Sequence, residues 1–257
     1  MVSLIAEAER ICIEGAICPS AGPLAFFRSR ELKPLDVVTN GTFGLVDTGQ
    51  KKLLVTCQHV WDGYLDFRLK NPNAILAALL GEVAIPISES QLIAEDRDCD
   101  LATFDVGPFL RAFSQMKFQQ IRRFPVPRSK PGEVIVCVGY PGEDVGRKIS
   151  EREARFDYIS FIRMVTAVGA YQVLLAESPE HLHLVDNSGN EVPPVAYKGM
   201  SGSPCYKWSP NAAPKLKGFL KAGEQTGAPI YITHAAFLQP DGSVDDSLNA
   251  EELHWQQ

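Results

Sequence analysis

Short hydrophobic runs separated by turn-forming residues constrain the fold of this chain more than any other feature. The 257 residues include 20 glycines and 18 prolines, which interrupt the hydrophobic pattern along most of the chain. Runs of this kind, rich in β-branched and aromatic residues and bounded by Gly, Pro or Asp, are typical of strands. Because no long helical pattern lies between them, the sequence predicts an all-β protein with antiparallel sandwich or barrel architecture.

The predicted strands lie between residues 37 and 235. The first three are Val37–Val38, Thr42–Val46 and Leu53–Thr56, and the composition of Asp47–Gln50 is typical of a hairpin turn. Further strands are expected at Phe67–Leu69, Val83–Ile87, Gln91–Ala94, Leu101–Val106, Val134–Val138, Ile159–Val168, Gln172–Leu175, Cys205–Lys207, Lys217–Ala222 and Ile230–Ala235.

The two ends of the chain show other patterns. Hydrophobic residues at helical spacing predict a short amphipathic helix over residues 3–14, and the prolines of residues 15–34 indicate an irregular connection. We therefore expect an N-terminal helix and connection over residues 1–35, a main domain over residues 36–240, and an acidic, polar C-terminal tail over residues 241–257.

Charge and hydropathy exclude several classes of partner. The formal net charge is −6, from 25 basic and 31 acidic residues, and prolines interrupt the most basic stretch, 122–130, so we expect no nucleic-acid partner. The longest hydrophobic run, Ala74–Leu80, is far too short to span a bilayer. Acidic residues among the first ten do not fit a signal peptide. These features predict a cytoplasmic protein without a membrane partner, and its six sparse cysteines are expected as thiols.

Three short segments contain residues suited to nucleophilic catalysis. His59 ends a Thr-Cys-Gln-His segment after a hydrophobic strand, Asp100 precedes Leu-Ala, and Ser201 lies within Gly-Met-Ser-Gly-Ser-Pro. A serine hydroxyl needs a base within hydrogen-bond reach, and an imidazole oriented by a carboxylate can be that base. Each segment alone is more often structural than catalytic. Together they give the order His, Asp, Ser, with 41 positions from the first residue to the second and 101 to the third.

This order and spacing resemble those of the chymotrypsin-like serine proteases, and more closely their bacterial trypsin-like members than the digestive enzymes. The resemblance extends over residues 43–237, although only the three segments are specific. A weaker fourth match is Gly-Tyr-Pro-Gly at residues 139–142, which can also be read as a strand that ends in a turn.

The resemblance implies a fold of two packed six-stranded antiparallel β-barrels. The first barrel is expected at about residues 36–108 and the second at about 130–240. His59 and Asp100 would lie on the first barrel and Ser201 on the second. The same resemblance places the strand of Cys137 beside that of Cys205, so this is the cysteine pair to examine if the protein is exported.

The resemblance also assigns a role to each site residue. His59 is the general base, Asp100 orients it, and Ser201 is the nucleophile, while the backbone N–H groups of Gly199 and Ser201 form the oxyanion hole. The substrate-binding residues are expected in the segment before Gly199 and in a later strand: Val195, Tyr197 and Lys198, then Gly218, Leu220 and Ala222. Val195 stands where trypsin-type enzymes have an acid, which favours a small or apolar substrate residue over Arg or Lys.

One residue of the third segment departs from the digestive enzymes. Met200 stands where they have an aspartate that pairs with a newly cut N-terminal amine. A methionine cannot form that ion pair, so activation by N-terminal cleavage is not expected. Since an uncontrolled protease would be harmful in the cytoplasm, a protein activator is the expected means of control.

Alternatives to individual residues remain open in the sequence. Asp98 and Asp105 flank Asp100, and a strand with period two would place Asp98 on the same face. A zinc site from Cys57 and His59 with Cys99, or with His181 and His183, is conceivable by residue type. However, no second ligand pair has the spacing of structural zinc sites. The α/β-hydrolase reading fails, because Gly-Met-Ser-Gly-Ser at residues 199–203 does not match Gly-x-Ser-x-Gly, and the acid and histidine required after the serine would have to be Glu224 and His234 in a region without a predicted helix behind the serine.

The sequence therefore predicts a serine endopeptidase that cleaves protein or peptide substrates through an acyl-enzyme, without a metal or other cofactor. The main alternative is a fold of the same kind that serves as a non-catalytic binding or scaffold module.

Overall fold

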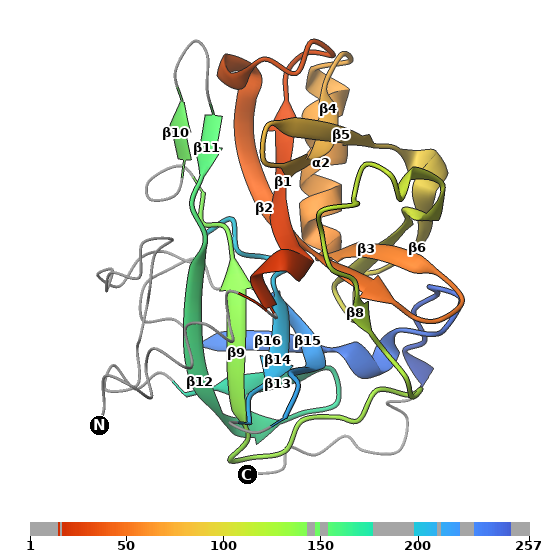
Figure 1. The fold of residues 1–257 in the computed structure, drawn as a ribbon, viewed down its shortest axis with the longest axis vertical. Coiled ribbons are helices and arrows are strands. Elements are labelled where there is room, and N and C mark those ends of the chain that lie inside the picture. The colour runs from red at the N-terminus through yellow and green to blue at the C-terminus, as the bar shows by residue number, and fades with distance from the viewer. Residues whose placement is uncertain are drawn as a thin grey trace.

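The structure is a computed structural model that describes Gly15 and residues 17–142, 147–149, 154–176, 198–209, 212–221 and 229–247. These residues form two lobes of strands, the first above the second in Figure 1, and a single α-helix, α2 (Gln58–Lys70). None of the helices within these ranges has the length and hydropathy needed to cross a bilayer. The described part of the chain is mostly β, as the sequence predicts.

Turns, 3-10 helices or the helix α2 separate the strands along the chain. The strands are β1 (Ala21–Phe27), β2 (Val37–Asp47), β3 (Lys52–Thr56), β4 (Ile75–Leu80), β5 (Val83–Ile87), β6 (Leu92–Asp96), β7 (Leu101–Asp105), β8 (Gln119–Gln120), β9 (Val134–Gly139), β10 (Arg147–Ile149), β11 (Ala154–Phe156), β12 (Ile159–Val168), β13 (Gln172–Leu175), β14 (Pro204–Lys207), β15 (Lys215–Lys221) and β16 (Ile230–His234). The 3-10 helices are η2 (Cys18–Ser20), η3 (Pro34–Asp36), η4 (Glu89–Gln91), η5 (Gly107–Phe109) and η7 (Ala235–Phe237).

The first lobe contains an eight-stranded sheet. Hydrogen-bonded neighbours follow the order β5-β4-β1-β2-β3-β7-β6, and β8 pairs with β2 in parallel. The predicted hairpin is present, since β2 and β3 pair antiparallel up to Asp47 and Lys52. The closed six-stranded barrel expected for this half is not formed: among the described strands, β5 and β6 remain the two edges of an open sheet. Strands β1 and β4, which the sequence did not predict, add to the number of strands in this sheet compared with the expected barrel.

The second lobe is the closed barrel that the sequence predicts for this half. Its six strands follow the order β12-β13-β16-β15-β14-β9, and neighbouring strands are antiparallel. Buried aliphatic and aromatic residues fill its interior, among them Phe161, Val173 and Ile232. Cys137 on β9 and Cys205 on β14 are paired in register, and both are free thiols.

The two lobes share a hydrophobic core. Val46 and Val55 of the first sheet belong to the same buried cluster as Val136 and Phe219 of the barrel. Gly44 allows this close packing, because a Cβ atom there would lie 3.0 Å from Pro204 Cβ and 3.1 Å from the Phe219 ring. Residues from both lobes are therefore held against each other beside this boundary.

The helix α2 replaces a strand expected at Phe67–Leu69. The buried side chains at its start, Val60, Trp61 and Tyr64, lie on one helical face, and Trp61 packs edge-on against Phe104 at 5.1 Å between ring centroids. Aromatic and β-branched residues favour strands by propensity. Packing of one helical face onto the sheet overrides that preference here.

The strand β1 also differs from the sequence prediction, which gave an irregular connection. All seven of its residues are buried, so the alternation that marks a half-buried strand is absent. Its glycine and proline further favour a loop in the sequence. Gly22 is needed in this strand because the Phe43 ring would lie 2.4 Å from a Cβ atom there. The helix expected at residues 3–14 lies outside the described residues.

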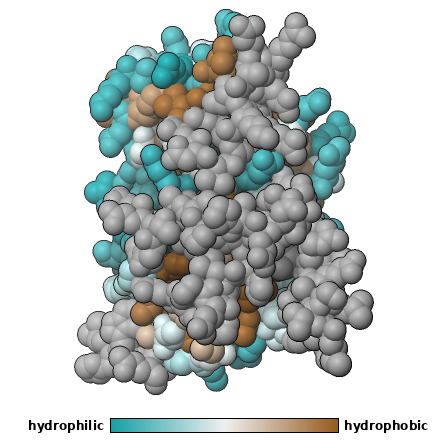
Figure 2. Space-filling view, turned by 90° about the vertical axis from the view of Figure 1, so that its left-hand side faces the viewer, coloured by the Kyte–Doolittle hydropathy of each residue, from teal (hydrophilic) through white to brown (hydrophobic). Residues whose placement is uncertain are grey.

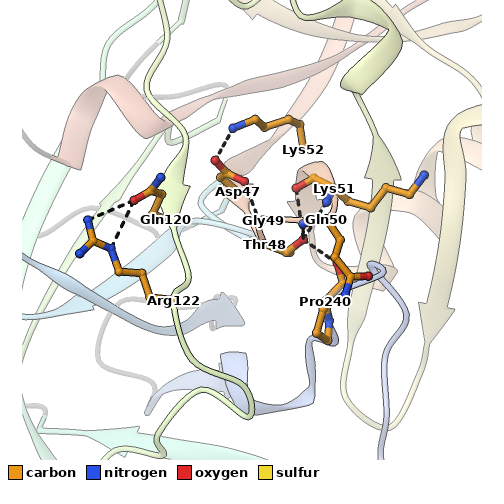
Figure 3. Close-up of polar contacts among 9 residues, drawn as sticks. All are labelled: Asp47, Thr48, Gly49, Gln50, Lys51, Lys52, Gln120, Arg122 and Pro240. Atoms are coloured by element: carbon orange, nitrogen blue, oxygen red, sulfur yellow. Dashed lines mark hydrogen bonds and ion pairs between the residues drawn. The ribbon is translucent and has the colours of Figure 1, made fainter.

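The segment after β16 returns to the first lobe. Figure 3 shows Thr48 in the β2–β3 turn, where its hydroxyl donates to Pro240 O at 2.5 Å. Thr103 of β7 donates to Gly242 O at 2.7 Å. Residues 241–247 of the expected tail are thus attached to the first sheet, and residues 248–257 lie outside the described residues.

The first lobe carries a hollow that lies apart from the predicted catalytic residues. Its volume is about 940 Å³, and its lining includes Phe27, Leu79 and Val83 but none of the three catalytic candidates. Figure 2 shows hydrophobic residues gathered at the upper end of the molecule, among hydrophilic ones. The three catalytic candidates lie outside this hollow.

Candidate active site

Asp100 is the buried centre of the site. It lies in the turn before β7, its exposed fraction is 3%, and its backbone φ is +52°. A positive φ is uncommon outside glycine and is tolerated best by Asp and Asn. This backbone turns the carboxylate towards the start of α2 instead of along the face of the following strand.

His59 binds this carboxylate through two different groups. Its backbone N–H donates to Asp100 Oδ1 at 3.0 Å, and its ring nitrogen Nδ1 lies 2.9 Å from Oδ2. His59 occupies the first turn of α2, where backbone N–H groups lack partners within the helix. Asp100 therefore caps the helix and orients the imidazole. Because a carboxylate can only accept, Nδ1 carries the proton and Nε2 remains the basic nitrogen.

The rival acids of the sequence are placed elsewhere. Asp98 is exposed. Asp105, at the other end of β7, pairs with Lys51 at 2.6 Å and accepts from the Gly107 N–H at 2.8 Å. Of the three aspartates, the structure brings Asp100 to the imidazole.

Ser201 lies in a tight loop between the lobes. We name residues 199–203 the oxyanion loop, after the role predicted for it. Gly199 and Gly202 both have a φ of +90°, a conformation that L side chains rarely adopt. A Cβ atom at Gly202 would lie 2.4 Å from Thr56 Oγ1, so the loop approaches the end of β3, three residues before His59.

The loop is fixed to both lobes through its backbone. Gly202 N–H donates to Leu220 O of the barrel at 2.9 Å, and Thr42 N–H of the first sheet donates to Ser201 O at 2.9 Å. Ser201 is 7% exposed. Between Ser201 and His59, both within the described residues, no hydrogen bond joins Oγ to the ring. Such catalytic hydrogen bonds are often long before substrate binds.

The predicted oxyanion donors are the backbone N–H groups of Gly199 and Ser201. Neither the Gly199 N–H nor the Ser201 N–H donates a hydrogen bond to another described residue. Met200 between them is fully buried in the barrel core, where a charged N-terminal amine would find an apolar thioether. The backbone N–H groups of Gly199 and Ser201, on either side of buried Met200, are of the kind that can stabilise an oxyanion.

The electrostatics keep Asp100 ionised. Burial by itself raises the pKa of Asp100, but hydrogen bonds from His59 and the charge of Lys221 lower the pKa below its usual value. Lys221 at the end of β15 places Nζ 3.7 Å from Asp100 Oδ2. An ionised carboxylate can stabilise the imidazolium that forms when His59 takes a proton.

Cys57 completes a set of atoms that could be considered for a metal ion. Its thiol, the His59 ring and the Asp100 carboxylate offer ligand atoms within 4.8 Å of one another. However, burial raises the pKa of Cys57 well above its usual value, and the thiol lies 3.1 Å from Leu220 O as a donor. Zinc binds the thiolate form, so a protonated Cys57 thiol that donates to a carbonyl is a poor metal ligand.

Among the residues of the other zinc alternatives, Cys99 is described and lies outside this set. Cys99 is buried and is not part of the group of ligand atoms within 4.8 Å. His181 and His183 lie outside the described residues.

The predicted substrate-binding residues are only partly described. Lys198 is exposed at the entrance of the oxyanion loop. Gly218 is packed against Thr233 O, and the Leu220 side chain lies fully buried in the barrel core. Period two explains the burial of Leu220, since alternate residues of a barrel strand face inward. A role of Gly218 and Leu220 in substrate binding stays a prediction.

The remaining predicted substrate contacts, Val195, Tyr197 and Ala222, lie outside the described residues. Sequence reasoning also missed two residues that contact the site, Thr42 and Lys221. Both lie within or beside strands and match no motif of the three segments. No signal in the sequence distinguishes them from other strand residues.

Comparisons with known proteins find similar structures but no similar sequence. Neither a protein family nor a curated protein matches its sequence. Among solved structures, it is similar to a chain from work on coupled folding and binding of the Sesbania mosaic virus VPg protein (13% identity, TM-score 0.48, covering 83% of this chain and 85% of that one). It is also similar to a thermostable serine protease, AL20, from an extremophilic microorganism (13% identity, TM-score 0.47, 84% and 91% covered).

A further similar structure is the HtrA-type protease AlgW with a tripeptide, at 16% identity and a TM-score of 0.44. The match covers 89% of this chain but 59% of AlgW. Likenesses of this strength assign no activity, so function has to be argued from the site itself.

Proposed function

We propose that this protein is a serine endopeptidase of the chymotrypsin-like type. The observation that carries the proposal is the hydrogen-bonded pair of His59 and Asp100, set at the lobe boundary beside the loop of Ser201. The fold supports the same proposal, because His59 follows a strand of the open sheet and Ser201 precedes a strand of the closed barrel.

The site residues fit the steps of acyl transfer. His59 Nε2 accepts the Ser201 hydroxyl proton as Oγ attacks the substrate carbonyl, and Asp100 stabilises the imidazolium. The Gly199 and Ser201 N–H groups then hold the oxyanion. Proton return from His59 expels the amine and leaves an acyl-enzyme. Water attacks this ester by the same route and regenerates the serine.

Protein or peptide substrates and control by a protein activator remain part of this proposal. The preference for a small or apolar residue before the cleaved bond is supported by Val195 in the sequence. The buried position of Met200 supports a control mechanism other than pairing with a new N-terminus.

Labelling with a fluorophosphonate probe tests the proposal directly. The wild-type protein should become covalently labelled, and Ser201→Ala should not. Ser114→Ala, which changes an exposed serine outside the loop, should be labelled like the wild type. Equal labelling of wild type and Ser201→Ala would contradict a catalytic role for this serine.

The alternative is a non-catalytic binding module on the same fold. The lack of a direct hydrogen bond between Ser201 Oγ and the His59 ring is what such a module would show. Absence of labelling in the wild type, with candidate activators or without them, would favour this alternative.

A further inference from the structure

Thr42 of β2 connects the first sheet to the oxyanion loop through several hydrogen bonds. The residue is fully buried. Its hydroxyl lies 2.9 Å from Gly199 O and 3.0 Å from the Tyr140 nitrogen. Its backbone N–H donates to Ser201 O at 2.9 Å, and its carbonyl accepts from the Thr56 hydroxyl at 2.7 Å. One residue of the first lobe thus binds the loop at two points.

The direction of the hydroxyl is determined by its partners. The Tyr140 N–H can only donate, so the Thr42 oxygen must accept from it. The single hydroxyl proton is then left for Gly199 O, which can only accept. The Thr42 hydroxyl therefore has one arrangement that satisfies both buried partners.

Four consecutive carbonyls in this region are anchored. Lys198 O accepts from Gly142 N–H at 2.6 Å, Gly199 O from the Thr42 hydroxyl at 2.9 Å, and Ser201 O from the Thr42 N–H at 2.9 Å. The fourth, Met200 O, accepts from the Ser203 N–H at 3.0 Å and from its hydroxyl at 2.5 Å.

Anchored carbonyls determine where the oxyanion donors point. In a trans peptide the C=O and N–H bonds are antiparallel. Fixing Lys198 O therefore directs the Gly199 N–H to the opposite side, and fixing Met200 O does the same for the Ser201 N–H. The peptide that links these two units is held by the Thr42 hydroxyl. Rotation of that peptide would break the hydrogen bond that Gly199 O accepts from the Thr42 hydroxyl.

We propose that Thr42 is a positioning residue that holds the oxyanion loop in its catalytic conformation from the opposite lobe. It does so without the ion pair that Met200 cannot form. The inference rests on the proposed function for its catalytic consequence. Its structural part, restraint of residues 199–203 by the Thr42 hydroxyl, can be measured without any activity.

The test compares three variants. Thr42→Val removes the hydroxyl at nearly constant volume, and Thr42→Ser keeps it. Thr103→Val is the matched control, because Thr103 is also fully buried in the first lobe and its hydroxyl also binds a distant carbonyl, Gly242 O at 2.7 Å. If Thr42→Val does not fold, Thr42→Cys, whose thiol is a weak donor, takes its place.

Two quantities are measured for each variant: the second-order rate constant of fluorophosphonate labelling, and hydrogen exchange of the peptide that contains residues 199–203. Thr42→Val should label about 10- to 100-fold more slowly, somewhat less than the loss of an oxyanion donor itself. Its loop should exchange faster than in the wild type. Thr42→Ser should stay within about 3-fold of the wild type in labelling rate. Thr103→Val should change neither the labelling rate nor the hydrogen exchange of residues 199–203.

The outcomes separate the two proposals. If the wild type is not labelled but Thr42→Val alone accelerates loop exchange, the endopeptidase proposal fails and the restraint by Thr42 stands. If Thr42→Val labels like the wild type, or if Thr103→Val slows labelling as much, the inference about Thr42 is overturned.

Discussion

The Asp100 carboxylate binds His59 through both the backbone N–H and the ring Nδ1, at 3.0 and 2.9 Å. The same contact that orients the base therefore also fixes the first turn of α2. Orientation of the imidazole does not depend on a flexible loop.

Asp100→Asn isolates the charge of this contact from its geometry. Asparagine tolerates the φ of +52°, so the backbone should be retained, whereas alanine would add strain. Removing the charge of the orienting carboxylate lowers the turnover of a serine protease by about 10⁴, so we expect a loss of roughly 10³ to 10⁴ in labelling rate. Asp98→Asn, at the exposed rival acid, should label normally. An equal loss in both variants would argue against Asp100 as the partner of His59.

Lys221 should modulate the pH dependence of the reaction. Its ammonium lies 3.7 Å from Asp100 Oδ2 and competes with the imidazolium for the same carboxylate. Removing this charge in Lys221→Met takes away one of the causes that lower the pKa of Asp100, so that pKa should rise and the acid limb of the rate–pH profile should move to higher pH. The side chain is 43% exposed, so a shift of less than about one pH unit is expected, smaller at high salt.

Lys215→Met, at the exposed start of the same strand, serves as the control for this measurement. Profiles of labelling rate against pH for wild type and both variants should differ only for Lys221→Met. A shift towards lower pH would contradict the proposed competition.

Gly199→Ala should damage the site more than a comparable change elsewhere. The φ is +90°, and a Cβ atom would lie 2.5 Å from Gly142 N, so both strain and a clash are introduced. Gly132 has a φ of +82° but no neighbour within 4 Å, so Gly132→Ala introduces the strain alone. We expect a loss of about 1 kcal/mol of unfolding free energy for Gly132→Ala, and about 2 kcal/mol or more for Gly199→Ala.

Urea denaturation gives these free energies, and the labelling rate gives the functional effect. Gly199→Ala should label at least about 10²-fold more slowly, while Gly132→Ala should keep the wild-type rate. Similar stabilities for the two variants would show that the close approach to Gly142 is not important.

His234 should destabilise the protein in mild acid. Burial lowers the pKa of His234 to about 4, against a usual value of 6.5. An unfolded chain binds this proton below pH 6.5 while the folded chain does not. The contribution of neutral His234 to the free energy of unfolding is therefore complete above pH 6.5 and is lost as the pH falls towards 4. Between pH 6.5 and 4.5 the loss should be about 2–3 kcal/mol.

His234→Gln removes the titrating group, so its stability should change less than that of the wild type over this range. The carboxylates with lowered pKa values, such as Asp100, add their own acid dependence only below about pH 4.5. Parallel curves of unfolding free energy against pH for the two proteins would count against this account of His234.

The sequence predicted the β class and the hairpin after Asp47, because periodic patterns and turn residues are local signals. The six-stranded second barrel was implied by the resemblance alone. It also named the residues that meet at the site. His59 and Asp100 could be paired because their spacing and neighbours resemble a known arrangement. Their hydrogen-bonded contact depends on the helical start of α2, which the sequence reading did not anticipate.

Other features could not be predicted because they depend on tertiary contacts. The strand β1 is buried on both faces, so its sequence lacks the alternation of hydrophobic and polar residues that marks a strand. Its glycine and proline therefore led to the prediction of a loop. The inward direction of the Leu220 side chain follows from the closure of the barrel, which the sequence around it does not encode locally. Thr42 contacts Gly199 across 157 residues, a distance at which no sequence pattern connects them.

The attachment of Gly242 to Thr103 links the end of the described chain to the first sheet. During synthesis on a ribosome, β7 would emerge long before this partner does. The first lobe therefore acquires its last hydrogen bonds only after the second barrel has been made. Folding of the first lobe is therefore completed only when nearly all of the described residues have left the ribosome.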